Sequence, residues 1–369
     1  METHEELTQQ YSTWGDKLLQ HTDVLNSIQN HKQFKPITIQ LAPGEMCDSD
    51  CPFCSVAARP LKSFLPWQKV VQVLTDFKKL GAKSVEITGG GNPMLYKDRE
   101  ANKDINDIIN VAADLGYKIG IITNSSNLEK IKKENHEKIQ WIRISLIKLD
   151  EGRAPEDYQF HGFPYSKLGF SYIIYDGTNG IPDVLSRTKK PYAGTTVESI
   201  QKIAKLVELH PGIKFVRIAG NCLIKGNNAT IKTQYKEVID ELDKFNKFFI
   251  KDIGEDDGPY DKGCYVGAIR PYIAAHPQGT EVGEHQVYIC TSHVLNHRVY
   301  DLAYSLGPVS DIRLIWERMN LNYATKGFPY EIKGNDGKGW CNSCKYCYYK
   351  FNNKLLHTVA QEMPDKDFP

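Results

Sequence analysis

The residues with the clearest chemical potential are three cysteines in the stretch GEMCDSDCPFCSV at residues 44–56. Cys47, Cys51 and Cys54 give the spacing Cys-x3-Cys-x2-Cys. Three thiolates from one tight loop can hold three corners of a four-iron, four-sulfur cube, whereas such a cube or a structural zinc normally takes four protein ligands. The array therefore predicts a metal centre whose fourth position is supplied from elsewhere or left open.

The composition favours metal ligation over disulfide bonds. The chain has 369 residues, 9 cysteines and a net charge of +1. Its start, METHEELTQQ, is acidic and polar, unlike a secretory signal, and no apolar run approaches the roughly 18 residues of a spanning helix. We therefore expect a cytoplasmic protein with no membrane partner, in which reduced cysteines bind metal. The near-neutral charge does not indicate a nucleic-acid partner, although a local basic channel would be invisible in that sum.

Six short apolar runs alternate with helical patterns and must position these cysteines. We expect buried parallel strands at residues 36–42, 84–88, 118–123, 141–147, 168–175 and 214–219. The connections carry apolar residues at helical spacing, as from Trp67 to Phe77. Six βα units in series predict an α/β fold, a partial (β/α)6 parallel barrel with its active site at the carboxyl ends of the strands. The three cysteines follow the first strand and so fall on that face.

The chain is expected to divide into three regions. The Gly/Asp-rich stretch GEDDGPYDKGC interrupts the βα rhythm and indicates a boundary. We predict an N-terminal helical extension at 1–35, the barrel at 36–253, and a smaller cysteine-rich α+β domain at 254–369.

The first cysteine array, with Phe53 just before its last member, resembles the signature of the radical S-adenosylmethionine (radical SAM) superfamily. The resemblance covers roughly residues 36 to 350. It implies a barrel of radical SAM type in which the open iron of a 4Fe-4S cluster binds S-adenosylmethionine. It further implies cleavage to a 5'-deoxyadenosyl radical, and a reductant such as flavodoxin or ferredoxin. A zinc loop with a borrowed ligand and a ferredoxin-like electron carrier are the alternatives.

A glycine run, ITGGGNPML at residues 87–95, follows the second expected strand and lets backbone groups approach a ligand closely. It resembles the family's Gly-Gly-Glu-type motif, which receives the methionine amino group; a simple turn is the alternative. Asn92 stands where many members have an acidic residue. Asn124 and Ser145 occupy strand ends where the family contacts the ribose and carboxylate, although either could be an ordinary cap. The predicted cofactor-binding residues are Phe53, Gly89, Gly90, Gly91, Asn92, Asn124 and Ser145.

A second cysteine group lies toward the C-terminus. Three of its members are spaced Cys-x2-Cys-x2-Cys in GWCNSCKYCYYKFNN, and two more precede them in the chain. The segment GCYVGAIRPYIAAHPQGTEVGEHQVYIC resembles the opening of the family's SPASM and twitch extensions. That resemblance implies one auxiliary 4Fe-4S cluster, with a zinc site as the alternative. Its ligands would be Cys264, Cys290, Cys341 and Cys344. Cys347 remains an extra ligand, a catalytic thiol or a spare cysteine.

Three further residues carry weaker chemical signals. Cys222, after the sixth expected strand, could donate a hydrogen atom to a substrate radical, or be a small buried hydrophobe. Arg143 and Arg217 lie in apolar strands and need partners if they point into the barrel. They could bind a carboxylate or phosphate of the substrate, or form structural ion pairs.

The predicted function is that of a radical SAM enzyme of oxidoreductase or isomerase type. A small-molecule or nucleotide-like substrate is favoured, because the N-terminal extension is short for the winged-helix module of many peptide modifiers. A peptide substrate, crosslinked or epimerised, is an alternative, with Tyr346, Tyr348 and Tyr349 as groove residues. Modification of a nucleic-acid base and a non-enzymatic iron-sulfur or zinc module are the other readings.

Overall fold

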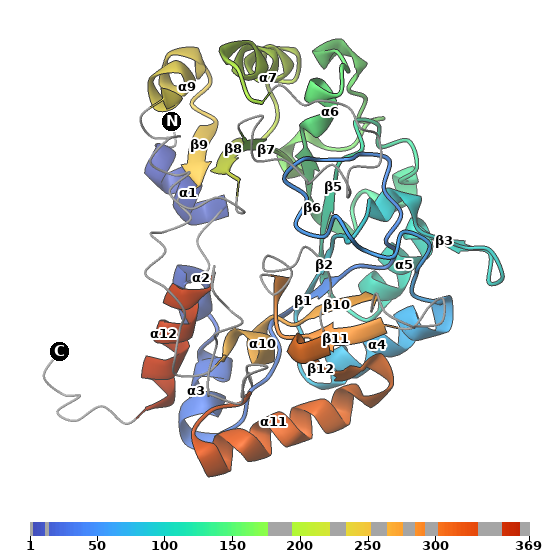
Figure 1. Cartoon of the computed structure of the whole chain (residues 1–369), viewed down its shortest axis with the longest axis vertical. Helices are drawn as coiled ribbons and strands as arrows, with labels where there is room; N and C mark the ends of the chain where they lie inside the picture. The colour runs from blue at the N-terminus through green and yellow to red at the C-terminus, as the bar shows by residue number, and fades with distance from the viewer. Residues whose placement is uncertain are drawn as a thin grey trace, which may run out of the picture.

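A single ten-stranded sheet runs through the computed structural model (Figure 1). Its strand order is β12-β11-β10-β1-β2-β5-β6-β7-β8-β9. The structure describes residues 3–11, 15–175, 194–221, 234–251, 264–275, 285–291, 302–330 and 349–361. The strands are β1 (Thr38–Leu41), β2 (Ser84–Ile87), β5 (Lys118–Thr123), β6 (Ile139–Ser145), β7 (Leu168–Ile174), β8 (Phe215–Gly220), β9 (Phe248–Lys251), β10 (Tyr272–Ala275), β11 (His285–Tyr288) and β12 (Ser305–Pro308).

All six predicted strands are present, and each is parallel to its neighbour from β1 to β8. The partial parallel barrel predicted from the sequence is therefore confirmed. A seventh parallel strand, β9, pairs with β8 and was not predicted. A separate two-stranded hairpin is formed by β3 (Lys97–Asp98) and β4 (Lys103–Asp104).

The helices fill the connections between the strands. They are α1 (His4–Tyr11), α2 (Gly15–Leu19), α3 (Thr22–His31), α4 (Trp67–Lys79), α5 (Ile105–Asp114), α6 (Ile147–Asp150), α7 (Val197–Leu209), α9 (Lys236–Leu242), α10 (Val266–Ile269), α11 (Ile312–Lys326) and α12 (Lys350–Ala360). Side chains at alternate strand positions, such as Ile39, Ile121 and Ile144, are fully buried in the main hydrophobic core. The opposite face of the strands, here called the inner face, carries polar residues such as Gln40 and Glu86.

The C-terminal part of the chain continues the same sheet beyond β1. Strand β10 is parallel to β1, with Gln40 opposite Tyr272, and β11 and β12 follow in antiparallel order. Helix α11 packs on α4, where the rings of Phe77 and Trp316 meet edge to face at 5.1 Å. The region thus mixes strands and helices. Residues 252–263, around the predicted domain boundary, lie outside the described part of the chain.

The N-terminal residues are helical, as the sequence indicates, but they form three short helices. Figure 1 shows α1 beside β9, with α2 and α3 beside α12. On α1, Tyr11 stacks on Phe215 at 4.3 Å, and Leu7 joins Phe215 and Phe249 in a small separate core. Within the described residues, no helix has both the length and the apolar character needed to cross a membrane.

Candidate functional site

The three cysteines of the first array lie together in the loop between β1 and α4. Cys47, Cys51 and Cys54 are only partly buried. A backbone turn joins the N–H of Cys54 to the carbonyl of Cys51 at 3.0 Å. Burial raises the pKa of Cys47, and raises that of Cys51 further, so these two thiols hold their protons at neutral pH when no metal is bound. A bound metal ion would displace those protons.

Arg59 places a positive charge within the cysteine loop, and the sequence analysis did not identify it. Its Nε donates to the carbonyl of Glu45 at 2.8 Å, and its Nη1 donates to the carbonyl of Val56 at 3.1 Å. Nη1 also lies 3.4 Å from the Sγ of Cys54. The buried guanidinium therefore fixes the loop backbone and faces a predicted cluster ligand. The signal available in the sequence was a single arginine five residues after the last cysteine.

The glycine run after β2 packs directly on the cysteine loop. A Cβ on Gly91 would lie 2.0 Å from the carbonyl oxygen of Met46, and the N–H of Gly91 donates to the carbonyl of Gly44 at 3.2 Å. The N–H of Asn92 donates to Met46 at 2.7 Å. These glycines allow a close approach of backbone to backbone with the chain's own cysteine loop, and their approach to a ligand stays a prediction. A Cβ on Gly89 would also overlap Gly91.

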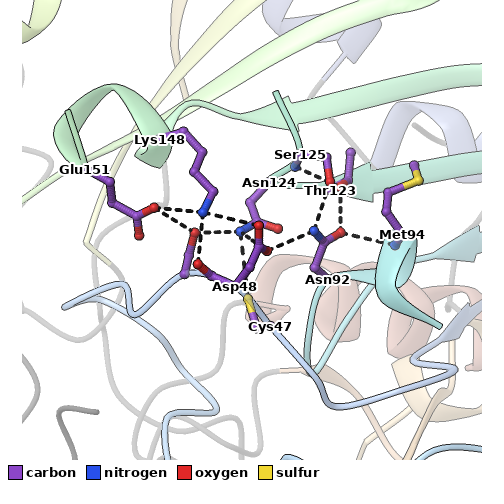
Figure 2. A network of polar contacts seen from close by, with 10 residues as sticks. Cys47, Asp48, Asn92, Met94, Thr123, Asn124, Ser125, Lys148 and Glu151 are labelled. Carbon is purple, nitrogen blue, oxygen red and sulfur yellow. Dashed lines mark hydrogen bonds and ion pairs between the residues drawn. The ribbon is translucent and has the colours of Figure 1, made fainter. Parts of the chain in front are cut away.

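Asn92 connects the cysteine loop to two strand ends (Figure 2). Its Nδ2 donates to Asp48 Oδ1 at 3.0 Å and to Ser125 Oγ at 2.9 Å. Its Oδ1 accepts from Thr123 Oγ1 at 2.8 Å and from the N–H of Met94 at 3.1 Å. These four bonds use both amide hydrogens and both lone pairs, which explains why an asparagine serves at this buried position.

Asn124, at the end of β5, points into the same network. Its Nδ2 donates to Ser49 Oγ at 2.7 Å, and lies 3.3 Å from Asp48 Oδ1 and 3.8 Å from Cys47 Sγ. The sequence singled out this residue as a cofactor contact. In the structure it positions the two residues that follow the first cysteine.

An ion-pair group from α6 completes the network, and the sequence analysis missed it. The Nζ of Lys148 lies 2.9 Å from Glu151 Oε2 and 3.3 Å from Asp48 Oδ2, and donates to the carbonyl of Asp48 at 2.9 Å. Glu151 in turn accepts from Ser49 Oγ at 3.1 Å. The cysteine loop is therefore held by residues that follow three strands: β2, β5 and β6.

Phe53 and Ser145 are also predicted to contact the cofactor, and Phe53 lies beside a buried acid with two tyrosine partners. Phe53 packs its ring on Tyr175 at 5.2 Å. The hydroxyls of Tyr172 and Tyr175 both donate to Oδ2 of Asp150, at 2.9 and 3.2 Å. Burial raises the pKa of Asp150 to about 6, although the two tyrosine hydrogen bonds act in the opposite direction. Ser145 ends β6 opposite Ser171 of β7.

Two cysteines of the second group are described, and both are buried. Cys264 precedes α10 and Cys290 follows β11. Arg270 lies close enough to Cys290 for their charges to interact. Its Nη2 forms an ion pair with Glu86 Oε2 at 2.8 Å, and its Nη1 donates to the hydroxyl of Tyr349 at 3.1 Å. The rest of the second cysteine group, the candidate hydrogen donor and two of the candidate groove tyrosines lie outside the described residues. They are Cys341, Cys344, Cys347, Cys222, Tyr346 and Tyr348.

The donor set suits a cluster with several irons. Among the described residues, no three His, Cys, Asp or Glu side chains are grouped tightly enough to hold one metal ion. In a cube each thiolate binds a different iron, so the ligands are spaced more widely than those of one ion. N–H donors face Cys54 and Cys47, which is favourable for thiolates. The loop therefore fits the cluster that the resemblance implies.

No curated protein matches this chain. SuiB of Streptococcus suis bound to the precursor peptide SuiA is 16% identical, with a TM-score of 0.46 over 79% of this chain and 68% of SuiB. The protein anSMEcpe with bound AdoMet and Kp18Cys peptide is 12% identical, with a TM-score of 0.45 over 88% of this chain and 97% of that one. BtrN in complex with AdoMet and 2-DOIA is 13% identical, with a TM-score of 0.38 over 85% and 94%.

These identities and TM-scores are low, so the assignment rests on a family model and on the site itself. The model described as the radical SAM superfamily matches residues 41–153. That span contains the cysteine loop, the glycine run, Asn124 and the Lys148–Glu151 pair. The chain therefore carries, at residues 41–153, a domain that matches the radical SAM superfamily.

Proposed function

We propose that this protein is a radical SAM enzyme that abstracts hydrogen from a small-molecule or nucleotide-like substrate, leading to dehydrogenation or rearrangement. Members of the superfamily are enzymes. When bound, the 4Fe-4S cluster and S-adenosylmethionine supply a 5'-deoxyadenosyl radical by reductive cleavage of the sulfonium. The chain's own residues hold the cluster, orient the cofactor and present the substrate.

The observation that carries this proposal is the attachment of the cysteine loop to three strand ends. Asn92 after β2, Asn124 after β5 and Lys148 after β6 all reach the residue that follows the first cysteine, Asp48. A ligand loop held from several rigid elements keeps a fixed geometry, which a reactive centre requires. A structural metal loop would need no such convergence at the carboxyl ends of barrel strands, where active sites gather.

The three cysteines would hold the first cluster, and each neighbouring residue has a definable task. Arg59 and Asn124 direct N–H groups at Cys54 and Cys47 and so favour their negatively charged forms. The glycine run brings its backbone against the loop at Met46. We further propose that Gly89, Gly90, Gly91, Phe53 and Ser145 line the cofactor.

The polar residues of the inner face favour the proposal that the substrate is a small polar molecule. Glu86, Arg143 and Arg270 lie close enough to influence one another's pKa values, although burial opposes the charge of each. Glu86 is paired with Arg270, so an apolar substrate would leave the charge of Arg143 without a partner of its own, at a cost of about several kcal/mol. We also propose an auxiliary cluster held by Cys264, Cys290, Cys341 and Cys344, and a flavodoxin-like or ferredoxin-like reductant.

The test replaces Cys47, Cys51 and Cys54 together with alanine. After anaerobic reconstitution, dithionite-driven formation of 5'-deoxyadenosine should fall to background, because no thiolate remains to hold the cluster. Thr325→Ala, on the exposed side of α11, is the matched control and should cleave S-adenosylmethionine as the unaltered protein does. Continued cleavage by the triple variant would refute the assignment of the cofactor site.

A further inference from the structure

Two rows of side chains run across the inner face from β6 to β8. In the upper row, nearer the carboxyl ends of the strands, Ser145 lies opposite Ser171. Arg217 lies opposite Ser171 on the next strand. In the row below, Arg143, Gly169 and Phe215 are in register. Paired residues of parallel strands point to the same side of the sheet, so both arginines lie on the inner face with a serine between them.

Aromatic rings form the floor beneath these polar groups. A Cβ on Gly120 would lie 2.2 Å from Cζ2 of Trp141, so the indole extends across the neighbouring strand. A Cβ on Gly169 would lie 2.3 Å from Cζ of Phe215 in the same way. The guanidinium carbon of Arg143 is 5.9 Å from the centre of the Trp141 ring. When the guanidinium of Arg143 lies over the Trp141 ring, its edge stays accessible to a ligand. That edge carries the N–H groups.

The charge of Arg143 is not matched by a carboxylate of its own. Glu86 is nearby, but its Oε2 is paired with Arg270 at 2.8 Å and its Oε1 accepts from Gln40 at 2.8 Å. Among the described residues, Arg143 forms no ion pair and its buried Nε has no hydrogen-bond partner. Burial lowers the pKa of Arg143, the charge of Glu86 raises it, and that of Arg270 lowers it again. Within the described part of the chain, Arg143 and Arg270 thus share one carboxylate, that of Glu86, and this group carries an excess positive charge.

We propose that Arg143 binds an oxyanion of the substrate, a carboxylate or a phosphate, on the inner face, with Ser171 and Arg217 beside it. This inference rests on the proposed function and specifies its substrate class. A guanidinium recognises both anions through two parallel N–H···O bonds. An oxyanion here would supply the partner that Nε lacks and balance the excess charge. Ser145 remains assigned to the cofactor, so the two anion sites are separate.

The proposal narrows the substrate to an anionic small molecule, such as a carboxylic acid or a phosphate ester. A neutral alcohol or sugar would leave Arg143 uncompensated. The aromatic floor adds an apolar surface against which the uncharged part of such a molecule can pack. A nucleoside phosphate fits both features.

The test measures anion binding by fluorescence, because Trp141 lies beside the site. The full chain, reconstituted anaerobically and saturated with S-adenosylmethionine, is titrated with inorganic phosphate and, separately, with acetate. A saturable change in fluorescence is expected with at least one probe, and Trp141→Phe should remove it. Arg143→Gln should weaken binding by about tenfold or more, since a charge-assisted pair is lost. Tighter binding of phosphate indicates a phosphate ester, and tighter binding of acetate a carboxylate.

Two further variants keep the result interpretable. Arg153→Gln removes an exposed arginine outside the sheet and should bind the probe normally. Arg143→Lys keeps the charge without the two-pronged geometry and should bind more weakly than the unaltered protein, even if Arg143→Gln fails to fold. Equal binding by the Arg143 variants, no binding of either probe, or binding that saturating S-adenosylmethionine abolishes would each overturn the proposal. Cleavage of S-adenosylmethionine by the unaltered protein tests the proposed function separately.

Discussion

At the scale of single residues, the cysteine loop is governed by a few side chains that face its sulfur atoms. Arg59 and Asn124 provide N–H groups toward Cys54 and Cys47. Arg59 acts from within the loop, whereas Asn124 arrives from the end of β5. A charge-assisted donor is stronger than a neutral one, so Arg59 has the larger influence on its thiolate. A lysine in place of Arg59 would lack the forked guanidinium, which also donates to the backbone carbonyls of Glu45 and Val56.

Asp150 is a buried acid next to the site, and its titration should be visible in stability. Its pKa is raised to about 6, mainly by burial. The folded chain therefore holds this proton more tightly than the unfolded chain, and the free energy of unfolding should fall as pH rises from about 4 through about 6. Asp150→Asn cannot ionise. Relative to the unaltered protein, it should gain about 1 kcal/mol between pH 5 and pH 7.

Urea unfolding at pH 5, 6 and 7 measures this difference. The exposed carboxylate of Asp114 on α5 provides a matched control, because Asp114→Asn should leave the shape of the pH profile unchanged. Parallel profiles for the unaltered protein and Asp150→Asn would show that Asp150 is already ionised at pH 5.

Some site residues could be found from the sequence because their spacing carries the information. The three cysteines share one short segment, and the structure places them in one loop. Asn124 follows a clear strand, so its position at the strand end was predictable. Lys148 and Glu151 belong to a helix of four residues, Ile147–Asp150, and its following turn, which has no periodic signature. Lys148 contacts Asp48 and Glu151 accepts from Ser49, and each contact joins residues about 100 positions apart that meet only when the strands lie side by side.

At the scale of elements, the glycine run acts as a contact surface between two loops. A Cβ on Gly91 would meet the backbone at Met46 O, at 2.0 Å, and backbone cannot rotate away as a side chain can. Gly91→Ala should therefore cost about 1–3 kcal/mol of unfolding free energy and reduce the iron bound after reconstitution. Both quantities are measurable on one preparation, by urea unfolding and by iron analysis.

Gly44→Ala is the matched control for this prediction. Gly44 lies in the same contact, but a Cβ there would meet Phe64 Cβ at 3.7 Å, an ordinary van der Waals distance. We expect little change in stability or iron content. If Gly91→Ala binds iron as well as Gly44→Ala does, the close packing of these loops is not required for cluster assembly.

The strands were predictable where each is a continuous β-branched run flanked by helical patterns. The missed strand β9 has only four residues, Phe248–Lys251, and follows a lysine-rich segment that continues the pattern of α9. Its pairing with β8 is a tertiary effect that local propensity does not encode. The stacking of Tyr11 on Phe215 was likewise unpredictable, because it joins residues distant in sequence.

At the scale of the whole molecule, the C-terminal region contributes to the inner face of the barrel. Strand β10 extends the sheet from β1. Arg270, directly before β10, reaches Glu86 on β2, and its other Nη contacts Tyr349 before α12. The hydroxyls of Tyr349 and Thr291 share a hydrogen bond of 3.0 Å, directly after Cys290. A set of polar contacts thus links Glu86, on the inner face, to Thr291, the residue that follows Cys290.

The last prediction is that the two predicted clusters assemble independently within one chain. If Cys264 and Cys290 are ligands of an auxiliary cluster, changing both to serine should lower the iron from about eight to about four per chain. The first cluster should remain, because its loop is held by β2, β5 and β6 rather than by the C-terminal region. Iron and sulfide analysis after reconstitution, with 5'-deoxyadenosine formation assayed on the same sample, separates the two sites. Unchanged iron in the double variant would show that these cysteines do not hold a cluster, leaving the first site as it stands.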